Sequence, residues 1–150
     1  MALKARIKDE MKAALLSGDR FVGETLRNLT AAILDEEVKL GKRDEGLSDE
    51  EIEKVVAREV KKRNESAKIY RDNNRPDLAE PEEREIEILQ AYLPKQLDET
   101  ELVAIIEVKI AELGVTGPQA MGQVIGAVKK QVGNAADGAA IARIVKQKLD

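Results

Sequence analysis

Four basic side chains near the end of the chain could bind phosphate groups. They are Lys129, Lys130, Arg143 and Lys146. The first two close one predicted helix before a glycine-rich turn at residues 133–138, and the other two lie three positions apart on the following helix. Because helix N-termini attract anions, this turn could also direct free backbone N–H groups at a phosphate. The alternative is that these cations complement the dipoles of their helices and solvate the surface.

A second candidate patch lies in the middle of the chain and comprises Arg58, Lys61 and Lys62. Residues 54–75, which contain it, carry a net charge of +5, whereas residues 76–99 carry −6. The acidic segment can lie against the basic helix and neutralise it, or the basic helix can be presented to phosphates. Exposed ion pairs are worth about 0–1 kcal/mol each, so they would orient the two helices without holding them together. The sequence leaves both interpretations open.

Residues suited to covalent or metal chemistry are scarce. The chain contains no cysteine and no histidine, which removes thiol chemistry, the commonest general base and the commonest metal ligand. Paired carboxylates such as Glu82 and Glu85 lie in charge-rich segments, which are typical of solvated helix faces. Gly122 and Gly126 are not followed by the Gly-Lys-Ser/Thr of a phosphate-binding loop. We therefore expect no catalytic residue, no metal and no cofactor, and no enzymatic activity by this chain alone.

The composition predicts an all-α protein. Charged residues make up 36% of the 150 residues and aromatic residues only 2%, as in chains built from amphipathic helices. The net charge of −4 argues against a surface that binds nucleic acid everywhere. The sequence shows no run of about 18 apolar residues and no signal-peptide core at its N-terminus. We therefore expect no membrane segment and a cytoplasmic location.

Periodicity and capping residues predict an N-terminal helical hairpin or bundle domain over residues 1–95. Apolar residues recur every four positions from Leu3, and Asp19 is placed to cap a second helix that folds back on the first. Ser48 opens a long third helix with a capping box. A short acidic helix follows Pro81 and completes the domain.

In residues 96–150, the capping residues predict a C-terminal three-helix domain. A capping box at Asp98 opens its first helix, Pro118 occupies the first position of the second, and Asp137 can cap the third. Such a cap would compete with any anion for the N–H groups of that helix. A unit of about 50 residues is marginal on its own, so contact with the first domain would help it.

Glycines stand out in the second helix of this domain and in the turn that follows it. Gly122 and Gly126 lie four positions apart on one helix face, where each costs roughly 1 kcal/mol relative to alanine. We favour the interpretation that another helix packs against this bare backbone. The alternative is a ligand, such as a nucleic-acid strand, that approaches it closely. Gly138 is expected to be a further structural glycine, at the end of the turn.

Three ordered segments carry a resemblance to a known family. They are residues 26–33 (LRNLTAAI), 87–97 (EILQAYLPKQL) and 121–138 (MGQVIGAVKKQVGNAADG). Over essentially its full length the chain resembles the YqeY family, whose members share a helical module with the C-terminal tail of the B subunit (GatB) of the glutamine-dependent Asp/Glu-tRNA amidotransferase. The family turn reads Lys-Gly-Arg-Ala-Asp-Gly, whereas residues 133–138 read Gly-Asn-Ala-Ala-Asp-Gly. Phosphate contacts at positions 133 and 135 therefore do not carry over.

The resemblance implies a two-domain helical fold and a non-catalytic tRNA-binding module. In the amidotransferase the related tail contacts tRNA, while the chemistry resides in domains that this chain lacks. One alternative is a protein-interaction adaptor whose partner is an aminoacyl-tRNA synthetase or an amidotransferase component. Another is a component of glutamine-dependent carbon–nitrogen ligase activity. We expect a monomer, and the sequence does not identify which tRNA or protein is bound.

Overall fold

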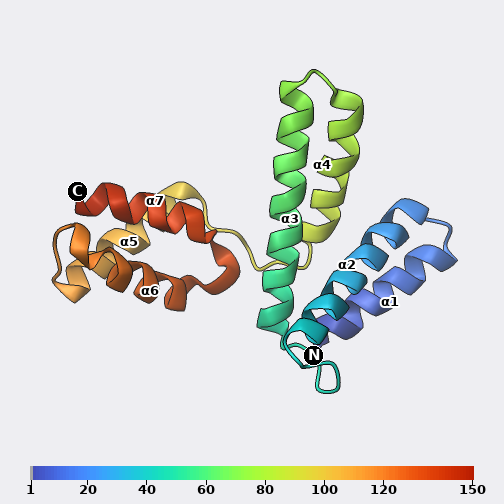
Figure 1. The fold of residues 1–150 in the computed structure, drawn as a ribbon, viewed down its shortest axis with the longest axis horizontal. Coiled ribbons are helices and arrows are strands. Elements are labelled where there is room, and N and C mark those ends of the chain that lie inside the picture. Colours follow the sequence, from blue (N-terminus) through green and yellow to red (C-terminus); the bar gives the residue numbers. More distant parts are fainter. Residues whose placement is uncertain (1) are drawn as a thin grey trace. The chain divides into compact units, whose positions relative to one another are not determined.

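The computed structural model describes residues 2–150, and all regular secondary structure in this part of the chain is helical. It contains seven α-helices and two short 3-10 helices, with no strand among the described residues (Figure 1). The predicted all-α class is therefore confirmed. The chain forms two compact units, the first ending at Leu93 and the second spanning Pro94–Asp150. That the two units fold independently, as domains 1–95 and 96–150, stays a prediction.

Two helical hairpins build the first unit. The helices are α1 (Ala2–Leu16), α2 (Arg20–Lys39), α3 (Asp49–Asp72) and α4 (Pro76–Gln90). α1 packs along α2 and α3 packs along α4, and α3 also contacts both helices of the first hairpin. Figure 1 shows the two hairpins as blue and green pairs of ribbons. The core between them is aliphatic apart from Tyr92, and its fully buried members include Ile52, Val56 and Leu89.

The helix ends of the first unit follow the predicted capping residues. The carboxylate of Asp19 accepts a hydrogen bond from Val22 N at 3.3 Å, and Ser48 and Glu51 form the predicted capping box. The Glu51 carboxylate also accepts a hydrogen bond of 2.8 Å from Lys42. Hydrogen bonds from Lys42 and from the backbone N–H of Ser48 lower the pKa of Glu51 to about 2.

The predicted start of the acidic helix was wrong. α4 begins at Pro76, so Pro81 lies inside the helix and does not precede it. Pro76 occupies the first helical position, where a missing N–H is harmless. Pro81 leaves the carbonyl of Asp77 without an intrahelical donor, but both residues are exposed and water can replace that donor.

Three helices and two 3-10 turns build the second unit. In chain order they are α5 (Glu99–Leu113), η1 (Pro118–Ala120), α6 (Met121–Val132), η2 (Gly133–Ala135) and α7 (Gly138–Leu149). Each of the three α-helices contacts the other two around a core that includes Ile106, Val128 and Ile141. The predicted capping box at Asp98 is present, and Gly114 closes α5 with a φ of 63°. Pro118 begins a 3-10 turn and not α6 itself.

None of the helices in residues 2–150 is long and apolar enough to cross a membrane.

Candidate nucleic-acid interface

One face of α6 is open to solvent along most of its length. Val124 and Val128 are fully buried, whereas Gly122 and Gly126 are exposed and therefore lie on the opposite side of the helix. A Cβ atom added at either glycine would meet no atom within 4 Å. The prediction that another helix packs against these glycines was therefore wrong for the described chain. Their spacing fixes a common helix face, but it does not say whether that face is the buried one.

Two lysines extend this open face toward the turn. Lys130 follows Gly126 by four positions, so it lies on the same side of α6, and its side chain is exposed. Lys129 reaches across to the next helix, because its Nζ would lie 3.5 Å from a Cβ atom at Gly138. Gly138 has no positive φ, and an added Cβ would make only an ordinary contact, so the predicted structural need for this glycine is not found.

The N-terminus of α7 lacks the predicted side-chain cap. Asp137 occupies the N-cap position, but its carboxylate accepts no capping hydrogen bond. Its carbonyl oxygen does accept one from Ile141 N at 3.1 Å, which starts the helical pattern. The carboxylate of Asp137 therefore does not occupy the N–H groups of the first turn, at an end that carries roughly half a positive charge. The ammonium group of Lys129 beside Gly138 adds a full positive charge there.

The turn before α7 is held by residues 94–97, the connector that precedes α5. Leu97 N donates to the carbonyl oxygen of Ala135 at 2.8 Å, and Gln96 Nε2 donates to that of Asn134 at 2.9 Å. Gln96 Nε2 also donates to the carbonyl oxygen of Pro94 at 2.8 Å. Within the turn, Gly133 has φ 55° and ψ −129°, a conformation that favours glycine. The shape of the turn thus depends on residues almost forty positions earlier, which the composition of the turn did not reveal.

The remaining two cations of the predicted group, Arg143 and Lys146, differ in whether they form an ion pair. Arg143 forms a 2.7 Å ion pair with Glu99 at the start of α5. Within the described chain, Lys146 forms no ion pair, and neither do Lys129 and Lys130. Three of the four predicted phosphate-binding residues are therefore free to meet an external anion, whereas Arg143 would first have to leave Glu99.

In the second predicted patch, on α3, nearby carboxylates neutralise two of the three positive charges. Arg58 pairs with Glu36 of α2 at 2.9 Å, and Lys62 pairs with Glu59 at 3.1 Å. Lys61 is exposed and forms no ion pair with the described residues. Partial burial opposes ionisation of Glu59, but hydrogen bonds from Arg63 and Lys62 outweigh it and lower the pKa of this carboxyl group.

The acidic helix α4 supplies further partners for α3. Arg63 forms a 2.7 Å ion pair with Glu85, and Arg71 forms one of 2.5 Å with Glu83. Of the two interpretations of this charge reversal, the structure therefore favours neutralisation. The basic helix is not presented to phosphates along its α4 side.

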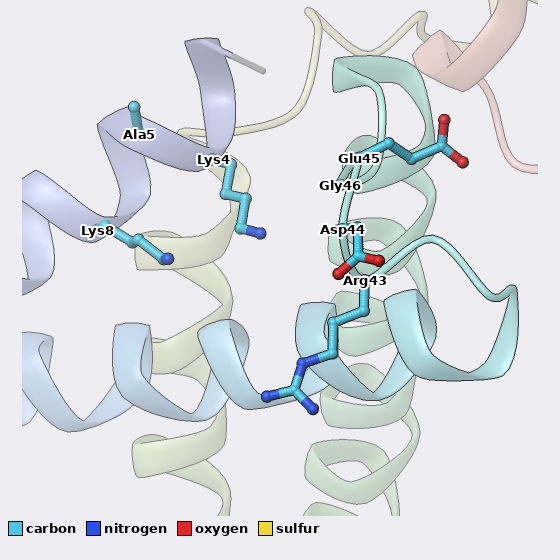
Figure 2. A pocket seen from close by; sticks show the side chains of 7 residues that line it. All are labelled: Lys4, Ala5, Lys8, Arg43, Asp44, Glu45 and Gly46. Atoms are coloured by element: carbon cyan, nitrogen blue, oxygen red, sulfur yellow. The ribbon is translucent and has the colours of Figure 1, made fainter.

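A pocket of about 280 Å³ lies between the first turns of α1 and the loop that joins α2 to α3 (Figure 2). Its charged lining residues are Lys4, Lys8, Arg43, Asp44 and Glu45. The ammonium group of Lys4 is 2.6 Å from the buried carboxylate of Glu37, which neutralises it. Because the remaining cations and carboxylates are balanced in number, the pocket lacks the excess positive charge that favours a phosphate.

Tyr92, within one of the three resemblance segments, has a structural role. Its hydroxyl donates a hydrogen bond to Glu10 on α1, and the guanidinium of Arg6 lies 4.8 Å from its ring centroid. Burial, followed by the Glu10 carboxylate, raises the pKa of Tyr92, and the same hydrogen bond lowers the pKa of Glu10. These contacts fasten the end of the first unit to α1. Tyr92 and Glu10 lie 82 positions apart, so no local pattern in the sequence indicates this contact.

The sequence matches the model of the family described as Yqey-like protein over residues 4–149. Several curated relatives share the name altered inheritance of mitochondria protein 41, mitochondrial. The one from Clavispora lusitaniae is 33% identical over 65% of this chain and 57% of its own length. The one from Lachancea thermotolerans is 30% identical over 76% of this chain and 61% of its own length. This chain therefore matches less than two thirds of each of these relatives.

These relatives contradict the expected cytoplasmic location, since their names describe mitochondrial proteins. That expectation rested on the lack of an apolar segment. Such a composition suits a mitochondrial compartment as well as the cytoplasm, so it could not distinguish them. The match over residues 4–149 covers nearly the whole sequence, and the chain belongs to the YqeY family.

Proposed function

We propose that this chain is a non-catalytic RNA-binding module that contacts the phosphate backbone of tRNA through α6, α7 and the turn between them. One observation carries the proposal. The Lys129 ammonium group lies beside the first residue of α7, at a helix N-terminus that its N-cap residue, Asp137, does not cap. A cation is disfavoured at the positive end of a helix dipole unless an anion joins it, and phosphate is the anion that helix N-termini commonly bind.

Two further features of α6 and α7 fit a nucleic-acid backbone. Lys130 and Lys146 supply additional cations without ion-pair partners in the described chain. Gly122 and Gly126 leave the backbone of α6 bare at these two positions, so a strand can approach it closely there. The sequence left open the alternative that a ligand closely approaches Gly122 and Gly126. The present proposal adopts that alternative.

The choice of tRNA rests on the resemblance to the amidotransferase tail. Contacts to phosphates and the sugar backbone fix the register and orientation of a protein on its nucleic acid without reading sequence. We therefore expect this chain to recognise the shape of tRNA and to show little preference for one tRNA over another. We expect it to act as a monomer, and any link to amidotransferase chemistry would come from a partner.

Salt-dependent filter binding with total tRNA tests this function. If three lysines neutralise three phosphates, the slope of log K against log salt falls between about −2 and −3. Changing both Lys129 and Lys130 to Glu is expected to abolish binding at moderate salt. The matched control changes Lys54 and Lys61 of α3 to Glu, which alters the net charge equally, and it is expected to retain most of the affinity. Equal losses in both variants, or no binding of the unaltered chain at low salt, would refute the proposal.

A protein-interaction adaptor is the second candidate, and the turn itself favours it. Residues 133 and 135 are Gly and Ala where the family turn has basic residues, which removes two phosphate contacts. An aminoacyl-tRNA synthetase or an amidotransferase component would then be the partner. Co-purification of such an enzyme that survives nuclease treatment would support the adaptor, whereas loss of the enzyme with the RNA would support direct RNA binding.

A further inference from the structure

We propose that Gln96 is a positioning residue for the candidate RNA interface, acting through the turn at residues 133–137. This inference rests on the proposed function. Gln96 lies on the connector, outside the helices that would meet phosphate. Its amide nitrogen donates to two carbonyl oxygens, those of Pro94 at 2.8 Å and Asn134 at 2.9 Å, and so links the connector to the turn.

The connector determines which way the peptide groups of the turn point. The carbonyl oxygens of Asn134 and Ala135 both accept hydrogen bonds from it. Because a trans peptide is planar, the N–H groups that follow these two carbonyls point away from the connector. A peptide flip that turned either oxygen toward a bound phosphate would have to break one of these bonds, so the connector keeps partial negative charge away from the anion.

Besides these bonds, the turn packs Ala136 against the core of the second unit. Its Gly133 adopts a backbone conformation that few other residues reach, and Asp137 does not cap the helix that follows. Lys129 lies beside Gly138, the first residue of α7, directly after the turn. If the turn rotates, the N-terminus of α7 and the ammonium group of Lys129 no longer face the same phosphate.

Replacement of Gln96 by Met tests the inference, because Met keeps the length of the side chain and removes both donors. Gln119 provides a matched control, since its Nε2 also donates to a backbone carbonyl of the second unit, that of Thr116 at 3.3 Å. We expect Gln96→Met to weaken tRNA binding by about threefold to tenfold, the equivalent of one hydrogen-bonded contact. Gln119→Met should bind as the unaltered chain does.

The salt dependence separates a positioning role from a charge effect or a loss of folding. Gln96→Met removes no charge, so the slope of log K against log salt should stay unchanged while the affinity falls. The thermal unfolding midpoint should also stay within the range of the Gln119→Met control. Affinity equal to that of the control, or a loss fully explained by a lower unfolding midpoint, would overturn the inference. If Lys129→Glu with Lys130→Glu leaves binding intact, the proposed function itself fails, whatever Gln96→Met does.

Discussion

Two segments, one from each unit, differ in how they use their basic side chains. Residues 54–75 of the first unit contain eight basic residues, and six of them form ion pairs with carboxylates. The last fifty residues contain six, but Lys129, Lys130 and Lys146 form no ion pair in the described chain. Of these two segments, the one with fewer cations therefore offers more that are free, three against two. Local charge density is a poor guide to a phosphate site unless the neighbouring carboxylates are also placed.

Substitutions in the two hydrophobic cores test whether the two units being compared are independent domains. Leu89 in the first unit and Ile106 in the second are both fully buried. Replacing either with Ala should lower the free energy of unfolding by about 2–5 kcal/mol. If the units are independent domains, calorimetry should show two transitions, with each substitution shifting only the transition of its own unit. A single transition shifted by both substitutions would show that the units unfold together.

The exposed face of α6 that carries Gly122 and Gly126 provides the next test. A substitution on this face should change stability and RNA binding in opposite directions. Gly126→Ala fills open space on an exposed helix face, so it should stabilise α6 by about 1 kcal/mol. If a nucleic-acid backbone approaches this face closely, the added methyl group should weaken tRNA binding. Thermal unfolding and filter binding on one preparation measure both effects. Higher stability with unchanged affinity would remove this face from the interface.

The Tyr92 contact tests how the first unit is fastened at its end. Tyr92→Phe should cost about 1 kcal/mol, because it removes the hydrogen bond to Glu10. The pKa of Glu10 is lowered in the folded protein, so this carboxylate stabilises the fold above its unfolded pKa and stops doing so as the pH falls through its folded pKa. The difference in stability between Tyr92→Phe and the unaltered chain should therefore shrink in acid. A difference that is constant from neutral pH to about pH 3 would contradict this assignment.

Release of the paired cations of α3 should have the smallest effect on stability. Glu83→Gln with Glu85→Gln leaves Arg71 without its carboxylate partner, and Arg63 with Glu59 alone. Exposed pairs contribute about 0–1 kcal/mol, so the unfolding midpoint should change little. Binding of RNA to the first unit should increase at low salt and disappear at higher salt. If the variant gains no affinity at low salt, ion pairing is not what keeps RNA from α3.

Local sequence signals predicted most of the helical framework. Asp19, Ser48 and Asp98 begin helices as their capping chemistry requires. The helix start predicted at Pro81 was wrong because a proline can occupy the first turn of a helix or lie within it. In α4 the first position is occupied by the upstream Pro76, and Pro81 lies within the helix. The predictions of which helix face is buried were less successful. The positions of Gly122 and Gly126 fixed their common side of α6, but the side that is buried depends on α5 and α7.

The candidate interface was predicted in part. Lys129, Lys130 and Lys146 were identified by their types and spacing, whereas the engagement of Arg143 by Glu99 joins residues 44 positions apart. The link from Gln96 to the turn has the same long-range character, and no local pattern encodes it. Asp137 had the right type and position for a cap, yet it makes no capping bond. Contacts between distant segments decide which predicted residues are free to bind.

The central claim is that RNA meets the free cations of α6 and α7 and not the more numerous cations of α3. Amide chemical-shift mapping of the full chain during a titration with tRNA tests it most directly. The predicted result is that shifts and line broadening concentrate at residues 122–146, with Gly138–Ala140 among the strongest, while residues 54–71 change little. Perturbations centred on α3, or none at low salt, would contradict the claim.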